Sequence, residues 1–175
     1  MDLKFLRPLG AVVLTLTALT AGLQPATADG TERKQTIHEM LLDIYTKQQK
    51  PDLAAGEIKA LIVLKPNDPV LHGQLGRTLA LKNDFKGAIP QFLISTKNDP
   101  SNGEYWGNLG ICYMQTGNYT GAVTVFTKAV TTQRQGGTDW RAHLQTAQQY
   151  VQHDEQVKQY NDQQKKQKKE AEDDN

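Results

Sequence analysis

Residues 106–113 read WGNLGICY, and residues 122–129 read AVTVFTKA. In each stretch, apolar and small residues recur three and four positions apart, which places them on one face of a helix. Gly117-Asn118, between the two stretches, interrupts this pattern and offers residues that end one helix and cap the next. The two stretches therefore predict a pair of helices joined by a short turn.

The same pattern occurs three times along the chain, in rows of equal length. The rows follow one another without insertion or deletion and begin at Gln35, Pro69 and Gly103. In the second and third rows Gly76 and Gly110 remove a side chain where two helices cross, so the backbones can approach closely. In the first row Leu42 stands at this position, and we expect that pair to cross more widely.

In the third row the spacing is W-x2-L-G-x2-Y followed by A-x3-F-x2-A, carried by Trp106, Leu109, Gly110, Tyr113, Ala122, Phe126 and Ala129. This spacing resembles the signature of the tetratricopeptide repeat family. The resemblance covers residues 35–136. It implies an all-α fold, a right-handed α-solenoid of three helix-turn-helix repeats at 35–68, 69–102 and 103–136.

The repeats are followed by one more helical pattern and a polar tail. An apolar stripe at i, i+4, i+7 and i+11 is formed by Trp140, Leu144, Ala147 and Val151. This stripe predicts a C-terminal capping helix at 137–152, which covers the apolar side of the last repeat. Residues 153–175 are rich in Gln, Lys, Glu and Asp, and we expect them to be partly helical or disordered.

The stretch 1–28 has the features of a signal peptide. Lys4 and Arg7 form a short basic region, an uncharged apolar run extends over 9–23, and Ala26 and Ala28 mark a cleavage site directly after Ala28. As a helix the apolar run spans about 22 Å, which is short of the bilayer core, although an uncleaved anchor remains the alternative. We therefore expect an exported protein, periplasmic or secreted, with no stable membrane span after cleavage.

Composition and motifs indicate a protein without catalytic activity. The 20 Lys+Arg residues balance 19 Asp+Glu residues, which argues against a nucleic-acid binder. Cys112 is the one cysteine, so an intramolecular disulfide and a Cys-rich zinc site are excluded. His38 and His72 lie one period apart at the position of Trp106, and we interpret them as replacements for an aromatic side chain. We predict no catalytic residues, no metal site and no cofactor.

The resemblance also implies where a ligand would bind. In that family the first helices of successive repeats line a concave surface, and ligands bind there. Carried over to this sequence, the groove is lined by Glu39, Asp43, Gly73, Gln74, Arg77, Gly107, Asn108, Ile111 and Met114. Its first end is then acidic and its far end apolar, and Gly73 and Gly107, at equivalent positions, would leave room for a ligand backbone.

The expected function is that of an exported, non-catalytic scaffold that binds an unknown protein or peptide in this groove. One subfamily clamps acidic chaperone tails with Lys and Asn, and the equivalent positions here are Glu39, Asp43, Gln74, Glu104 and Asn108. Acidic residues stand where cations are needed, so we expect no binding of that type. The alternatives are a self-assembling structural unit and an accessory subunit of an envelope enzyme complex.

Overall fold

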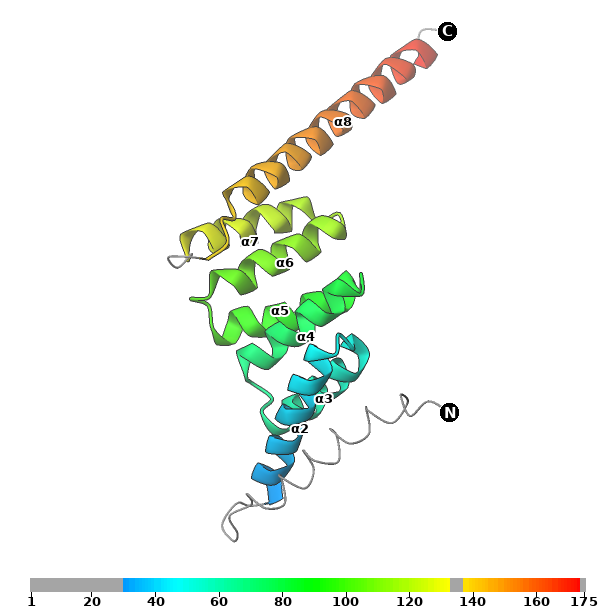
Figure 1. Ribbon diagram of the computed structural model, residues 1–175. Coiled ribbons are helices and arrows are strands. Elements are labelled where there is room, and N and C mark those ends of the chain that lie inside the picture. The colour runs from blue at the N-terminus through cyan, green and yellow to red at the C-terminus, as the bar shows by residue number, and fades with distance from the viewer. Residues whose placement is uncertain (1–29, 133–136, 174–175) are drawn as a thin grey trace, which may run out of the picture. The chain divides into compact units, whose positions relative to one another are not determined.

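The computed structural model describes residues 30–132 and 137–173 of the chain, and within these residues every regular element is a helix (Figure 1). The helices are α2 (Gly30–Lys47), α3 (Pro51–Leu64), α4 (Pro69–Leu81), α5 (Phe85–Asn98), α6 (Gly103–Gln115), α7 (Tyr119–Thr131) and α8 (Arg141–Asp173). The predicted signal peptide, with Ala26 and Ala28, lies outside the described residues. None of the described helices is long and apolar enough to cross a membrane.

The chain divides into two compact units, Met1–Thr36 and Ile37–Asn175. In the first unit the described residues, 30–36, are helical, and the Thr36 hydroxyl donates a hydrogen bond of 2.9 Å to the carbonyl of Glu32. The second unit holds the rest of α2 and all the other described helices, and the descriptions below concern this unit.

Helices adjacent in sequence pack against each other in the second unit, which confirms the predicted solenoid of helix pairs. The closest pairs are α4 with α5 and α6 with α7, while α5 packs on α6 and α7 packs on α8. The pair α2 and α3 is looser, and α2 buries no side chain completely. Leu42, in place of the glycine of the other pairs, is half-buried against the core of Ile58, Leu61, Leu71 and Leu75.

The turn inside each pair is built in the same way three times. Backbone N–H groups of Lys50, Asp84 and Asn118 donate to carbonyls five residues earlier, each at 2.9 Å. This bond closes the end of a helix when the preceding residue adopts a left-handed conformation. The residues that do so are Gln49 (φ 55°), Asn83 (φ 61°) and Gly117 (φ 77°), which occupy equivalent positions in the three rows.

Capping side chains mark the first residues of α4, α5 and α7, whereas α3 begins at Pro51 without a side-chain cap. Asp84 and Asn118 accept hydrogen bonds from the backbone N–H groups of Gly87 (2.9 Å) and Gly121 (3.0 Å). Asp68 caps α4 by accepting from the N–H of Val70 at 2.9 Å. These bonds satisfy donors that the first turn of a helix leaves without an intrahelical partner.

Aromatic rings and glycines hold the core together. Phe92 lies against Gly76 within the second pair, and Phe126 lies against Gly110 within the third. Both rings are almost completely buried, with exposed fractions of 1% and 0%. A side chain at either glycine would overlap the ring, so the predicted close crossing of these two pairs is confirmed.

The helix α8 continues the array and then leaves it. Trp140, directly before its first turn, is buried with Ala147 against α7, and Leu144 and Val151 are half-buried on the same stripe. From Gln152 to Glu170 every side chain is exposed, although α8 remains one helix to Asp173 (Figure 1). The end of packing near residue 152 is therefore a change in burial and not a break in the helix.

Candidate partner-binding groove

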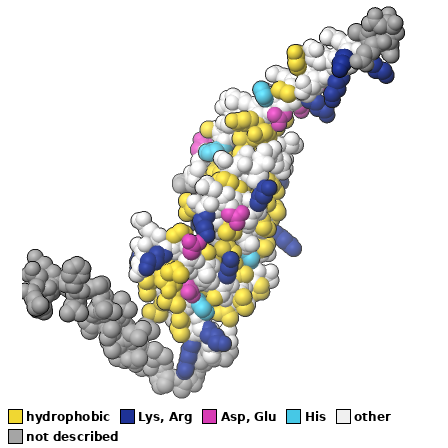
Figure 2. Space-filling view, turned by 90° about the vertical axis from the view of Figure 1, so that its right-hand side faces the viewer, with side chains coloured by type: hydrophobic (Ala, Val, Ile, Leu, Met, Phe, Trp, Pro, Cys, Tyr) yellow, Lys and Arg dark blue, Asp and Glu magenta, His cyan; other side chains and the backbone are white. Residues whose placement is uncertain are grey.

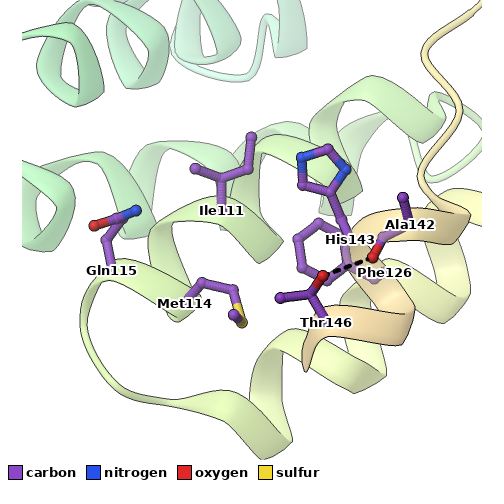
Figure 3. Close-up of a pocket in the computed structure, with 7 residues that line it drawn as sticks. All are labelled: Ile111, Met114, Gln115, Phe126, Ala142, His143 and Thr146. Carbon is purple, nitrogen blue, oxygen red and sulfur yellow. Dashed lines mark hydrogen bonds between the residues drawn. The ribbon is translucent and has the colours of Figure 1, made fainter. Parts of the chain in front are cut away.

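A pocket of about 380 Å³ opens between α6 and the start of α8. Its walls are Ile111, Met114 and Gln115 from α6, Phe126 from α7, and Ala142, His143 and Thr146 from α8. Figure 3 shows the α6 and α8 side chains on opposite sides of one space, with the Phe126 ring next to His143 and Thr146. The volume lies at the small end of the range for ligand pockets, which suits one or two side chains of a larger ligand.

The pocket is mainly apolar, and its polar groups lie on the α8 wall and at Gln115. The Thr146 hydroxyl donates to the carbonyl of Ala142 at 2.9 Å, so it is already satisfied within its own helix. The His143 ring lies 5.6 Å from the ring of Phe126 and 5.3 Å from that of Trp140, centroid to centroid. His143 is held against aromatic rings while its side chain stays exposed, so its nitrogens can reach a ligand at the rim.

The structure brings together Ile111 and Met114, two of the residues that the resemblance implied. Both lie half-buried on the α6 wall of the pocket. The other seven residues do not line it. The far, apolar end of the predicted groove therefore coincides with this pocket, and the acidic end and the middle lie outside it.

Gly73 and Gly107 are buried under rings that lie about one repeat period further along the chain. A Cβ on Gly73 would collide with the Tyr105 ring, and a Cβ on Gly107 would overlap the indole of Trp140. The room that we expected there for a ligand backbone is taken by these two side chains. The two glycines let neighbouring repeats approach each other instead.

In the middle of the predicted groove the Asn108 side chain is engaged within the chain, whereas the side-chain oxygen of Gln74 is buried with no hydrogen-bond partner among the described residues. The Asn108 amide donates to the carbonyl of Glu104 at 2.8 Å, and the Glu104 carboxylate accepts from the N–H and hydroxyl of Thr138 at 2.8 and 3.1 Å. Arg77 is exposed near Tyr105. Burial and the negative charge of Asp99 raise the pKa of the Tyr105 phenol, and the Arg77 charge opposes this shift.

The acidic end of the predicted groove carries matched cations. Glu39 forms an ion pair with Lys65 at 3.8 Å, and Asp43 forms one with Lys47 at 2.7 Å. All four side chains are well exposed, so each pair contributes little to stability. Their charges nevertheless offset one another, which removes much of the attraction that this end would have for a basic ligand.

Phe126, Ala142, His143 and Thr146 line the pocket but were absent from the predicted groove. The sequence analysis treated the helix after Gly137 as a cap and assigned it no binding residue. The available signal was the period itself, because a fourth row of the same length begins at Gly137 and places α8 where another first helix belongs. A cap helix therefore supplies one wall of a site as well as covering the core.

The two repeat-related histidines have structural partners. His72 bonds through Nε2 to the carbonyl of Pro66 at 2.9 Å, and Trp106 Nε1 donates to the equivalent carbonyl of Pro100 at 2.9 Å. His72 is buried in the position of the indole, as interpreted from the sequence. His38 pairs with Glu57 of α3 at 2.6 Å, one repeat before the contact of His72 with Gln91.

The described residues bring no group of three or more His, Cys, Asp or Glu side chains together in a metal-binding arrangement. Cys112 is completely buried, and burial raises the pKa of its thiol to about 11. The thiol therefore stays protonated at neutral pH, which suits a small apolar core residue and not a nucleophile.

A family model described as "Tetratricopeptide repeat" matches residues 74–138. A search of curated proteins found no match. Among solved structures, the TPR domain of Sgt2 from Aspergillus fumigatus is similar with a TM-score of 0.60 and 15% identity, covering 75% of this chain and 85% of that one.

Two further similar structures are described, respectively, as a complex and as having a peptide-binding site. The TPR2B domain of yeast Sti1, in complex with pHsp70, has a TM-score of 0.58 and 17% identity over 69% of this chain and 98% of that one. YrrB, described as a TPR protein with an unusual peptide-binding site, has a TM-score of 0.54 and 25% identity over 72% of this chain and 60% of that one. At these identities the likeness to the first two structures concerns the fold alone.

Proposed function

We propose that this chain, whose residues 74–138 match the tetratricopeptide-repeat family, is an exported, non-catalytic scaffold that binds a protein or peptide segment between α6 and α8. The observation that carries the proposal is the pocket lined by Ile111, Met114 and His143 where α6 and α8 both pack against α7. A similar domain bound to a peptide, and another described with a peptide-binding site, support the same class of function.

The lining of the pocket favours a peptide that inserts an apolar side chain. The half-buried side chains of Ile111 and Met114 offer apolar surface beside the buried Phe126 ring, and methionine adapts its shape to different ligands. His143 and Gln115 at the edge can bond to the backbone on either side of such an anchor. This division into an apolar floor and a polar rim is typical of peptide and protein interfaces.

Photo-crosslinking in the native host tests this proposal without knowledge of the partner. A photoreactive amino acid replaces Gln115 at the pocket, and in a matched control it replaces Lys128, which is exposed on α7 and does not line the pocket. We expect one discrete adduct from position 115 and none of the same mass from position 128. The adduct should disappear when Met114→Glu is added, because the carboxylate would be placed in an apolar space. Identical adducts from both positions, or none from position 115, would contradict the proposal.

Acidic chaperone tails provide a second test with a defined probe. The first TPR domain of Spaghetti (RPAP3) has been seen with the HSP90 peptide SRMEEVD. In this chain Glu104 is held by Thr138 and the Asn108 amide by its own helix, so neither provides a cationic clamp. We expect SRMEEVD to show no saturable binding in calorimetry, and micromolar binding would overturn this part of the proposal.

Export is the second part of the proposal, and it depends on the sequence of the stretch 1–28. Expression of the full chain in its host, followed by N-terminal sequencing of the exported fraction, should give a mature chain that begins at Asp29. Ala28→Pro should leave the longer precursor, because the small residue before the cleavage site is lost. A native chain that stays inside the cell with Met1 intact would refute export.

A further inference from the structure

The far part of α8 is a long helix that lies in solvent beyond the end of the repeats. Every side chain from Gln152 to Glu170 is exposed, which corresponds to a helix about 28 Å long. Lys166 and Glu170 form an i, i+4 ion pair at 3.9 Å, which is a weak contribution for such exposed side chains. A solvent-exposed helix of this length is only marginally stable in water unless a partner covers one of its faces.

One face of this segment has the spacing of a two-helix interface. Its residues alternate at steps of four and three: His153, Val157, Tyr160, Gln164 and Gln167. Val157 and Tyr160 are 44% and 61% exposed, although the rest of the segment is almost entirely polar. Steps of four and three keep a single face toward a partner helix, as in a coiled coil.

Charge is distributed unevenly along the same segment. The half nearer the repeats, 152–162, carries Asp154, Glu155 and Asp162 against one cation, Lys158. The far half, 163–173, carries first the cations Lys165, Lys166, Lys168 and Lys169 and ends with Glu170, Glu172 and Asp173. Figure 2 shows the basic side chains gathered toward the far end of α8, with acidic side chains nearer the repeats. Two such helices attract each other when they run antiparallel, because the acidic half of each then faces the basic half of the other.

We propose that α8 pairs antiparallel with α8 of a second copy of this chain, about a two-fold axis beside Asn161 and Asp162. In this register Val157 packs on Gln167 of the second copy, and Tyr160 packs on Gln164. Asp154 flanks the interface opposite Lys168 of the second copy, and symmetry repeats this ion pair.

The length of the exposed segment agrees with this register. The axis lies at the middle of the stretch from Gln152 to Asp173, so pairing covers the far part of α8 in both copies. The overlap stops where Val151 begins to pack on the repeats, so each copy keeps its own repeat array outside the helix pair. The dimer does not involve the pocket between α6 and α8, so this inference is independent of the proposed function.

A charge-swap series measured by sedimentation equilibrium tests the pairing, using the protein as it is isolated from cells. We expect a reversible monomer–dimer equilibrium for the native chain. Lys168→Asp should weaken it about tenfold or more, because it replaces two attractive pairs by two repulsive ones. The double variant Asp154→Lys/Lys168→Asp should restore the dimer, since the two charges are merely exchanged.

Lys169→Asp is the matched control, because it makes the same charge change one position further along, on the face turned away from the stripe. It should leave the dimer intact, and circular dichroism should show equal helix content for all variants. A native chain that is monomeric throughout a series reaching the high micromolar range would overturn the proposal. So would a dimer that Lys168→Asp does not weaken or that the double variant does not restore.

Crosslinking distinguishes the antiparallel from a parallel arrangement. Asp154→Cys and Lys168→Cys proteins are mixed and treated with a short bifunctional maleimide, and the native Cys112 is buried and unreactive. We expect dimers that contain one chain of each variant. Dimers formed by the Asp154→Cys protein alone would show a parallel pair and overturn the register.

Discussion

At the residue scale, Gly107 and Gly56 are both helical glycines, but their surroundings differ. A Cβ on Gly107 would overlap the Trp140 indole, whereas a Cβ on Gly56 would meet no atom within 4 Å. Gly107→Ala should lower the free energy of unfolding by about 1–3 kcal/mol, because the ring must move out of a packed core. Gly56→Ala should raise it by about 0.5–1 kcal/mol, because alanine loses less entropy in a helix.

Urea titrations followed by circular dichroism at the helix band measure both effects. The two variants make the same chemical change, so a general effect of alanine on these helices would move both midpoints in one direction. Shifts of the same sign would therefore show that the indole does not occupy the space beside Gly107.

Cys112 gives a prediction about pH. Burial raises its pKa from 9.0 to about 11, so the unfolded chain loses the thiol proton at a lower pH than the folded chain does. The stability that the buried neutral thiol provides is complete below pH 9 and declines as pH rises toward 11. Ellman's reagent at pH 8 should leave the folded protein unlabelled and react with one thiol in urea.

Cys112→Ser provides the comparison for the stability measurement. Its hydroxyl does not ionise in this range, so the unfolding midpoints of the two proteins should diverge above pH 9. Rapid labelling of the folded native chain at pH 8 would contradict the buried position.

At the element scale, the three intra-repeat turns share one geometry but have different residues at the left-handed position. Gln49 holds φ 55° where the third repeat has Gly117 at φ 77°. A side chain in this region costs about 1–2 kcal/mol in steric strain, although a single residue can tolerate it. Gln49→Gly should therefore stabilise the first pair by about 0.5–1 kcal/mol.

Thermal unfolding and hydrogen exchange of α2 and α3 measure this gain. Gly117→Ala is the reverse change at the equivalent turn and should destabilise the third pair by a similar amount. An unchanged or lower midpoint for Gln49→Gly would show that the first turn is not strained in the way described.

Periodicity predicted the helix pairs, but it did not predict every residue of the pocket. The helix pairs, the glycine crossings at Gly76 and Gly110, and the replacement of an indole by His72 all follow from local spacing. The pocket wall formed by His143 and Thr146 does not follow from local spacing. It depends on the rotation of α8 about its axis, which is set by the packing of Trp140 and Ala147 against α7. A period assigns residues to a face, and only packing decides which neighbour that face meets.

At the scale of the whole molecule, α8 has two parts with different roles in stability. Trp140 and Ala147 are buried at the end of the array, with exposed fractions of 3% and 0%. A chain that ends at Gln152 should keep the unfolding midpoint of the repeats at a concentration where the chain is monomeric, because every side chain described beyond this residue is exposed. A chain that ends at Thr132 should have a free energy of unfolding lower by several kcal/mol, because Phe126 and Ala129 would no longer be covered by Trp140 and Ala147.

Calorimetry of the two truncated chains and the native chain checks this division. If removal of the residues after Gln152 lowered the midpoint as much as removal of all of α8, the far segment would have to pack on its own repeats. That outcome would also remove the exposed face on which dimer formation depends.

By itself, the sequence determined the fold class, the pairing of helices and the residues at each turn. Each is decided by contacts a few positions apart or one repeat period apart, and spacing reports such contacts directly. The tertiary structure decided which parts of the predicted groove stay open to a ligand. It covered Gly73 and Gly107 with rings, paired Glu39 and Asp43 with lysines, and left an apolar pocket between Met114 and His143. Those outcomes depend on the rotation and side-chain packing of neighbouring repeats, which no periodic pattern encodes.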